Sequence, residues 1–465
     1  MNVKAIRKYR LSHLVVSVVL PALIAMIATS ESVGAQTTPT ATTQGQVTFT
    51  KDVAPILQRS CQNCHRPDSM APMSLLTFED ARPWAKAIKE NVVRRNMPPW
   101  HIDPNVGIRE FKNSRALSDE EIEAIVKWVD GGAPKGNPAD MPPPRQFQDS
   151  DKWNIGTPDL VLQLPQDFVV PAKAPDAWPN IDVDSGLTED RYIQAVELKP
   201  TKGFKVVHHM GANLIYPDGT DTFLEADGVG GNGHSFEEGS GRLMKAGSKL
   251  RFGLHLHAIN QEMKTNVALA IKFYPKGYVP KHVAFTEVMG DALDLDFPPN
   301  TDNVRADGYA TLTKPTRIMA YQPHMHTRGK IMCMEAIYPD GRTDRVQTLN
   351  CANFNFNWHV VYEYATDVQP LLPAGTVLHI VSWHDNSANK PSNPDPDNWI
   401  GYGPRTIDDM SHAWITYYNL SDEEFKQAVQ ERKALEQTKA KDKAKAKVVL
   451  SDKVDDSSIR TAAQQ

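Results

Sequence analysis

The sequence is poor in cysteine, carries little net charge and has no long apolar run beyond its N-terminal segment. Its 465 residues include 4 cysteines, too few for a disulfide scaffold, and a net charge of −5 gives no basis for binding nucleic acid. No later apolar stretch approaches the roughly 20 residues that a membrane span needs. Because 40% of the residues are hydrophobic, the chain has enough apolar material for real cores, and a disordered protein is excluded.

The N-terminal segment predicts a secretory signal over residues 1–35. Basic residues between Lys4 and Arg10 precede an apolar run at residues 14–28, and Val33-Gly34-Ala35 offers the small residues of a cleavage site. We therefore expect a periplasmic or secreted protein with no stable membrane span after cleavage. An uncleaved anchor is the alternative, although the apolar run is short for one.

Composition shifts divide the rest of the chain. The predicted regions are a polar leader at 36–47, a helical domain at 48–132, a Pro-rich linker at 133–157, two β domains at 158–285 and 286–420, and a charged tail at 421–465. The tail is expected to begin as a helix and to end disordered. Helices are expected near Asp52–Arg59 and Thr77–Arg95, and a third after the capping box of Ser118 and Glu121.

The second half predicts two related antiparallel β-sandwiches. Its short apolar runs are separated by Pro, Gly, Asn and Asp turns. The sequence at Ile215–Gly219 recurs at Ile337–Gly341, and Ala246-Gly247 recurs as Ala374-Gly375. The expected fold class is therefore multidomain, with a small all-α domain followed by two β-sandwiches.

Cys61-Gln62-Asn63-Cys64-His65 is the C-x-x-C-H pattern of c-type haem attachment. In that chemistry the two thiols add to the haem vinyl groups, and the adjacent imidazole binds the iron. A zinc half-site would need further thiols or histidines nearby, and a redox dithiol would follow a strand of a βαβ unit. The pattern predicts one covalent haem c.

Met97 is the expected sixth haem ligand, because Pro98 and Pro99 could hold its loop against the haem face. A Met/His haem is a standard electron-transfer arrangement. Met70, Met73 and His101 are alternatives. The segment from Phe49 to about Gly132 resembles small monohaem cytochrome c domains.

Three histidine pairs in the second half indicate metal: His208-His209, His255 with His257, and His324 with His326. Residues i and i+2 of a strand face the same side, so an H-x-H pair delivers two imidazoles to one ion. Adjacent histidines face opposite sides of a regular strand. If His208 and His209 bind one ion, their strand must end or bulge there.

Imidazole suits zinc, copper, iron and nickel, and a thioether favours Cu(I). A blue-copper site is excluded, because Cys351 has its next histidine only at His359 and its next methionine at Met410. Cys333 and Cys351 instead flank the Asp340-Gly341 turn almost symmetrically. A cross-strand disulfide between them is expected in an oxidising compartment.

Residues 158–420 resemble the copper type II, ascorbate-dependent monooxygenases, which include the peptidylglycine and dopamine hydroxylating enzymes. Four fragments occur in the order of that family. They are His208-His209-Met210, the Leu254–His257 strand, the Ala320–Lys330 run with His324 and His326, and Asp408-Asp409-Met410 with Tyr417-Tyr418. The family's two jelly-roll-like sandwiches agree with the internal repeat.

The resemblance implies two copper ions with different roles. His208, His209 and His257 would bind the electron-transfer copper, with His257 fitting the third position better than His255. His324, His326 and Met410 would bind the copper at which O₂ reacts with a C–H bond of an organic substrate. The haem could relay electrons from a periplasmic donor in place of ascorbate.

This chain departs from the peptide-hydroxylating members at three positions that grip the peptide: Gln322, His412 and Trp414. Peptide amidation is therefore not predicted, and the substrate is left open. We expect a copper-dependent monooxygenase. The alternative is a non-catalytic electron-transfer or copper-binding cytochrome that keeps the ligands without hydroxylation.

Overall fold

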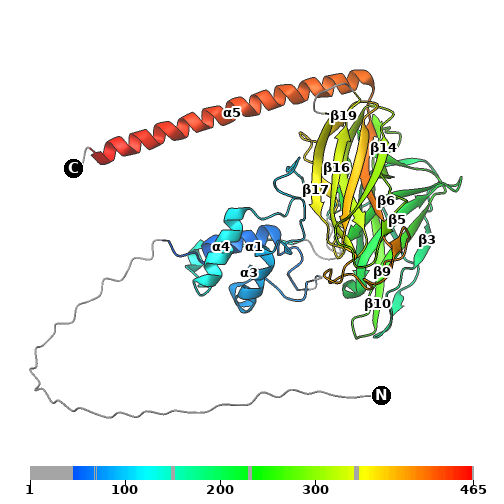
Figure 1. Cartoon of the computed structure of the whole chain (residues 1–465), viewed down its shortest axis with the longest axis horizontal. Coiled ribbons are helices and arrows are strands. Elements are labelled where there is room, and N and C mark those ends of the chain that lie inside the picture. The colour runs from blue at the N-terminus through cyan, green and yellow to red at the C-terminus, as the bar shows by residue number, and fades with distance from the viewer. Residues whose placement is uncertain are drawn as a thin grey trace, which may run out of the picture. The chain divides into compact units, whose positions relative to one another are not determined.

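The computed structural model describes residues 45–67, 69, 71–147, 152–228, 233–339 and 345–462 (Figure 1). The described residues from Gln46 onward belong to one compact unit. The predicted signal at 1–35 and most of the polar leader lie outside the described residues, as does Met70.

The three predicted helical regions are confirmed. Their elements are η1 (Phe49–Val53) with α1 (Ala54–Ser60), then α2 (Phe78–Ala81), η2 (Arg82–Trp84) and α3 (Ala85–Val93), and finally α4 (Asp119–Asp130). The predicted capping box begins α4: Ser118 Oγ accepts from the Glu121 N–H, and the Glu121 carboxylate accepts from the Ser118 N–H. The fully buried side chains of Phe49, Leu57 and Trp128 form the centre of the helical core.

The predicted linker begins by packing against these helices. The carbonyls of Pro134 and Lys135 accept hydrogen bonds from the N–H groups of Phe49 and Thr50, both at 3.0 Å, and the short helix η3 (Pro138–Asp140) follows. Arg145 donates to the Gln58 carbonyl at 2.7 Å. This part of the linker is therefore held in place rather than spanning open space.

Residues 100–115, which we name the docking segment, interrupt the helices and pack against the second sandwich. Ile102 forms an antiparallel bridge with Ala352, and the Ile108 N–H donates to the Leu349 carbonyl at 2.9 Å. The buried side chains of Trp100 and Phe111 belong to the core of that sandwich. Long-range pairing thus attaches the helical region to the β region.

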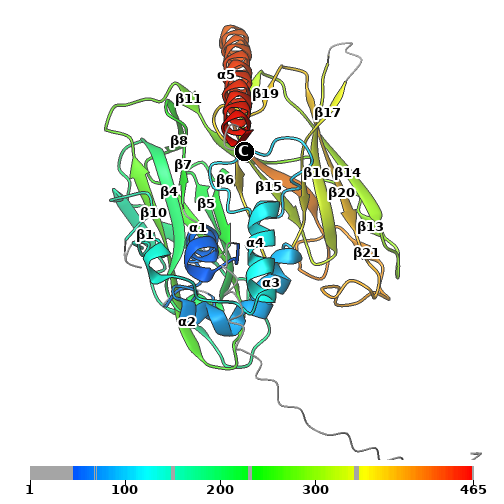
Figure 2. The ribbon, with the colours of Figure 1, turned by 90° about the vertical axis from the view of Figure 1, so that its left-hand side faces the viewer.

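The first sandwich combines two sheets, drawn mainly in green in Figure 2. One sheet has the path β1 (Leu160–Gln163), β10 (Met263–Phe273), β4 (Arg191–Lys202), β8 (Ser240–Met244) and β11 (His282–Val283), with β2 (Phe168–Val170) on β10 and β7 (His234–Ser235) on β4. The other has the order β3 (Asn180–Asp184), β9 (Lys249–Leu256), β5 (Val207–Ile215) and β6 (Asp221–Gly228). A 3-10 turn, η4 (Phe204–Val206), leads into β5.

Alternation along β5 decides which of its side chains face the first core. Met210, Ala212 and Leu214 are buried in that core, whereas His209 points to the opposite side of the sheet. This is the pattern of a strand with one core face, and it turns a histidine away from the apolar interior.

The second sandwich has the same two-sheet character. One sheet runs β12 (Phe285–Met289), β22 (Ser411–Asn419), β15 (Thr316–Met325) and β18 (Tyr362–Glu363), with β19 (Leu371–Leu372) also on β15. The other runs β14 (Val304–Thr311), β20 (Val377–His384), β16 (Gly329–Ile337) and β17 (Val346–Asn353), and β13 (Asp296–Phe297) pairs with β21 (Ile400–Gly401). The predicted disulfide joins Cys333 of β16 to Cys351 directly opposite on β17.

The internal repeat corresponds to equivalent places in the two sandwiches. Strands β5 and β16 each end at a copy of the first motif, and β9 and β20 each follow a copy of the Ala-Gly motif. The four-stranded sheets β3-β9-β5-β6 and β14-β20-β16-β17 therefore have the same order. The β-sandwich character expected from the sequence is confirmed.

The charged tail continues as helix α5 (Asp422–Ala462) (Figure 1). The tail was expected to begin as a helix and then lose structure, but the helix extends much further, since its Ala- and Lys-rich composition has high helix propensity. Among the residues that the structure describes, no helix is both long and apolar enough to span a membrane.

Gly107 provides a test of the docking segment. It has φ 63°, and an added Cβ would collide with the Leu349 carbonyl, whereas Gly186 has φ 67° and open space around its Cβ position. Gly186→Ala should cost about 1 kcal/mol of unfolding free energy from backbone strain alone. Gly107→Ala should cost about 3 kcal/mol or more, because it also disrupts the packing of the segment. Urea unfolding measures both, and equal losses would contradict this docking.

Candidate metal centre

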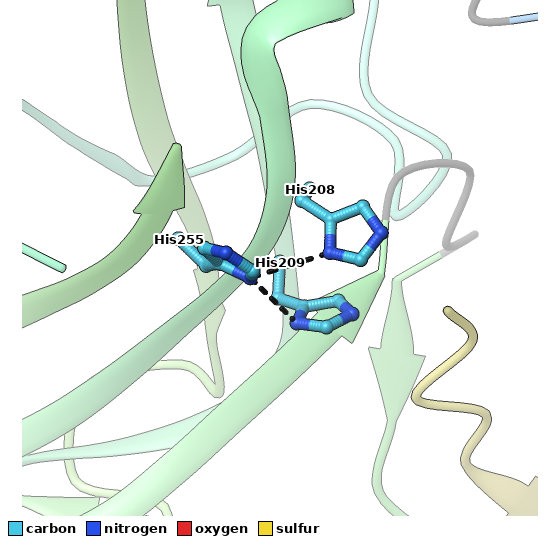
Figure 3. A group of neighbouring side chains, drawn as sticks. All are labelled: His208, His209 and His255. Carbon is cyan, nitrogen blue, oxygen red and sulfur yellow. Dashed lines mark hydrogen bonds between the residues drawn. The ribbon is translucent and has the colours of Figure 1, made fainter. Parts of the chain in front are cut away.

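Three histidine rings converge where β5 meets β9 (Figure 3). The Nδ1 atom of His255 lies 3.3 Å from Nδ1 of His208 and 3.4 Å from Nδ1 of His209. One ligand nitrogen from each ring lies within 4.8 Å of the others, so together they could hold a metal ion. The β5–β9 register shifts between Val207 and His209, an irregularity of the kind that adjacent histidines would need to face one ion.

Asp176 orients the ring of His255 towards β5. Its carboxylate accepts from Nε2–H of His255 at 2.8 Å and from Nδ1–H of His257 at 2.7 Å. Bound in this way, His255 keeps its Nδ1 lone pair directed at His208 and His209. Trp178 stacks on the same imidazole at 4.8 Å.

His257 lies outside this cluster. We expected it to be the third ligand in preference to His255, but the structure brings His255 to the pair. Strand β9 ends at Leu256, and His209 pairs directly with His255. The imidazole of His257 is 62% exposed. The i and i+2 rule applies only where the strand continues through both residues.

The paired histidines of β5 are uncharged at neutral pH. Burial lowers the pKa of His208 to about 4 and that of His209 to about 2, and the neighbouring histidines add to both shifts. At Asp176 burial raises the pKa, but the hydrogen bonds from His255 and His257 outweigh it and hold that pKa below its usual value. A neutral imidazole keeps the lone pair that a metal requires.

A second histidine group lies on the second sandwich. His324 of β15 pairs with His412 of β22, their rings stacked at 4.7 Å, and His326 follows the end of β15. The ring of His326 lies 5.5 Å from that of His324, and its Nδ1–H donates to the Asp408 carbonyl at 3.1 Å. This bond leaves Nε2 of His326 free for a metal.

Asp409 orders the segment that carries Met410. Its buried carboxylate accepts from the backbone N–H groups of His326 and Met410, both at 2.9 Å. Met410 directly precedes Ser411, which pairs with Met325. The half-buried methionine thus directly precedes β22, the strand that pairs with β15, at the end of the sheet where His326 lies.

His359 lies between the two groups, a position that the sequence did not indicate. Its ring centroid is 4.0 Å from that of His209 and 5.3 Å from that of His324. Burial and the neighbouring histidines hold the pKa of His359 well below its usual value. The sequence contains no pairing motif around His359, so only the fold reveals this position.

The C-x-x-C-H residues border a cavity of about 420 Å³ at the end of α1. Cys61, Cys64 and His65 line it together with Met97. The Nδ1–H of His65 donates to the Met73 carbonyl at 3.2 Å, which leaves Nε2 free. His101 lies in the docking segment; burial lowers its pKa to about 4, and its Nε2 is buried without a hydrogen-bond partner.

Burial raises the pKa of the Cys61 thiol to about 12 and also raises that of Cys64. Both sulfurs are therefore protonated thiols at neutral pH. A redox dithiol requires at least one thiol with a lowered pKa. This environment disfavours the redox-dithiol alternative.

Alanine variants of His255 and His257 separate their roles. His255→Ala should lose the metal of the first cluster, because it removes one of three converging nitrogens. His257→Ala should weaken binding by no more than about 10–100-fold, because it acts only through Asp176. Copper titration of the metal-free protein measures both. Loss of the ion in His257→Ala with retention in His255→Ala would reverse the assignment.

No protein-family model matches the chain, and no curated protein matches it. Among solved structures, an allantoicase aligns over 51% of this chain and 77% of its own at 8% identity, with a TM-score of 0.18. A Paenibacillus xanthan lyase aligns over 62% of this chain and 28% of its own at 12% identity, with a TM-score of 0.16. The tandem CBM22 domain of Xyn10C from Paenibacillus barcinonensis aligns over 58% and 96% at 10% identity, also with a TM-score of 0.16. Similarity this weak carries no argument about fold or function.

Proposed function

We propose that this protein is an exported copper-dependent monooxygenase. In this proposal the chain would hold a covalent haem c and two copper ions, which would supply the two electrons that monooxygenation needs. One oxygen atom of O₂ would enter a C–H bond of an organic substrate, and the other would leave as water. The observation that carries the proposal is the convergence of three Nδ1 atoms from His208, His209 and His255, with Asp176 fixing the ring of His255. Neutral imidazoles with fixed tautomers suit copper.

The first cluster is proposed as the electron-transfer site. It is built only from imidazoles, and two of its three rings are attached to the same irregular strand end. The Asp176 carboxylate would make His255 a better donor by accepting its Nε2–H. These residues would bind and orient the ion.

His324, His326 and Met410 are proposed as the oxygen site. The Asp408 carbonyl fixes the tautomer of His326, and Asp409 holds the backbone of both His326 and Met410. A thioether is a soft ligand that favours Cu(I). When bound, copper would supply one-electron redox chemistry and O₂ activation, and the protein would supply binding and orientation.

Cys61, Cys64 and His65 are proposed to bind haem c, with Met97 as the sixth ligand. The shared cavity, the free Nε2 of His65 and the raised thiol pKa values support this assignment over a redox dithiol. The Cys333–Cys351 disulfide is consistent with an oxidising compartment such as the periplasm, where a soluble donor would reduce the haem.

The double variant Cys61→Ser with Cys64→Ser tests the haem. It should abolish haem that survives denaturation, because both thioether bonds would be absent, and copper binding should be unaffected. Haem staining of the denatured protein is the measurement. Staining that persists in the double variant would exclude the cytochrome assignment.

Metal analysis combined with reductant-driven O₂ consumption tests the enzyme. The unmodified protein should hold two copper ions and consume O₂ faster than the metal-free form. Met410→Leu should keep both ions, since His324 and His326 remain, but lose most O₂ consumption with the thioether. Met289→Leu, a change in a buried methionine of β12, is the matched control and should behave like the unmodified protein.

Two results would change this assignment. Full O₂ consumption in Met410→Leu would exclude Met410 as the ligand and make His412, which stacks on His324, the first candidate. Two bound copper ions without O₂ consumption above the metal-free level would favour the non-catalytic electron-transfer protein.

A further inference from the structure

Two consecutive residues in the loop between β17 and β18 lie beside the candidate haem cavity and the candidate copper sites. Trp358 lines the cavity that Cys61, Cys64 and His65 border. His359, the next residue, has its ring 4.0 Å from His209 and 5.3 Å from His324. One peptide bond therefore links a residue that lines the cavity to a residue that lies beside both histidine groups.

We infer that Trp358 and His359 form the electron route from the haem to the copper ions. This inference rests on the proposed function. Each transfer moves one electron: ferrous haem is oxidised to ferric haem, and Cu(II) is reduced to Cu(I). No bond forms or breaks in Trp358 or His359, which act as positioning residues rather than as redox carriers.

Local hydrogen bonds hold this loop in one conformation. The Trp358 N–H donates to the Asn355 carbonyl at 2.9 Å, and the Asn357 N–H donates to Oδ1 of Asn355 at 3.0 Å. The His359 carbonyl accepts from Nε2 of Gln322, two residues before His324, at 3.4 Å. The backbone that carries both rings is therefore held against β15.

The docking segment ties the same loop to the helical region. Nδ2 of Asn113 donates to the Val361 carbonyl at 2.9 Å, and Asn113 itself lines the cavity with Trp358. Electron tunnelling slows steeply with distance through protein. A covalently linked pair of rings that contacts both sides gives a short and rigid connection.

His359 lacks the hydrogen bond at Nε2 that a purely structural buried histidine would normally make. Its Nε2 is buried without a hydrogen-bond partner, as is Nε2 of the neighbouring His209. Buried imidazole nitrogens normally find partners, so these two unpartnered atoms beside the histidine groups call for a role. Phe356 of the same loop lies near His209 but does not border the cavity, so it cannot replace Trp358.

Flash photoreduction of the haem under anaerobic conditions tests the route without turnover. In copper-loaded protein, the absorbance of reduced haem should decay as Cu(II) accepts the electron. Trp358→Leu and His359→Leu should each slow this decay by about tenfold or more, with haem content and copper stoichiometry unchanged. Trp358→Phe and His359→Phe keep a ring and should recover most of the rate. Trp84→Leu changes a tryptophan that is 45% exposed on the helical region and should have no effect.

The results of this experiment distinguish failure of the electron route from failure of the proposed function. If copper loading does not accelerate haem reoxidation in the unmodified protein, the proposed function fails. If it does, and either leucine variant keeps the unmodified rate, the inference is overturned while the function stands. A leucine variant that fails to bind its metals is replaced by Trp358→Met or His359→Gln, judged by the same rate.

Discussion

The Asp176 carboxylate accepts hydrogen bonds from both His255 and His257, and the geometry of the first histidine cluster depends on it. By binding Nε2–H of His255, it directs the opposite nitrogen of that ring towards His208 and His209. Without this acceptor the His255 ring could turn or change tautomer, and the three Nδ1 atoms would no longer converge. The bulge in β5 is the second requirement, because a regular strand would place His208 and His209 on opposite faces.

Burial shifts the pKa values of the histidines and of the cysteines in opposite directions, and in both cases it favours the uncharged side chain. Around the histidines it keeps the rings neutral, so their lone pairs are available to a metal at neutral pH. Around Cys61 and Cys64 it keeps the thiols protonated, which disfavours the chemistry of an exposed redox pair. The same physical effect thus keeps imidazole lone pairs available in one place and suppresses thiolate reactivity in the other.

The docking segment relates these two parts to each other. Its strand-like pairing with β17 and its two buried aromatic rings attach the helical region to the second sandwich. The loop that carries Trp358 and His359 follows β17 directly, so the pairing that anchors the docking segment also brings this loop to the cavity. The pairing of the docking segment with β17 therefore both attaches the helical region and places it near the histidines.

The sequence alone determined the features that depend on residues close together in the chain. The capping box of Ser118, the three helical regions and the pairing of Cys333 with Cys351 follow from local spacing, and all are present. The β-sandwich character follows from the turn pattern and the repeat, and it is present too. Only the tertiary structure decided that His255 rather than His257 joins the β5 pair, that Asp176 orients it, and that His359 lies between the two groups. Each of these depends on where a strand ends or on a contact between residues far apart in the chain. Hydrophobic periodicity and motif spacing describe a residue's own element, so they cannot specify which distant side chain it meets.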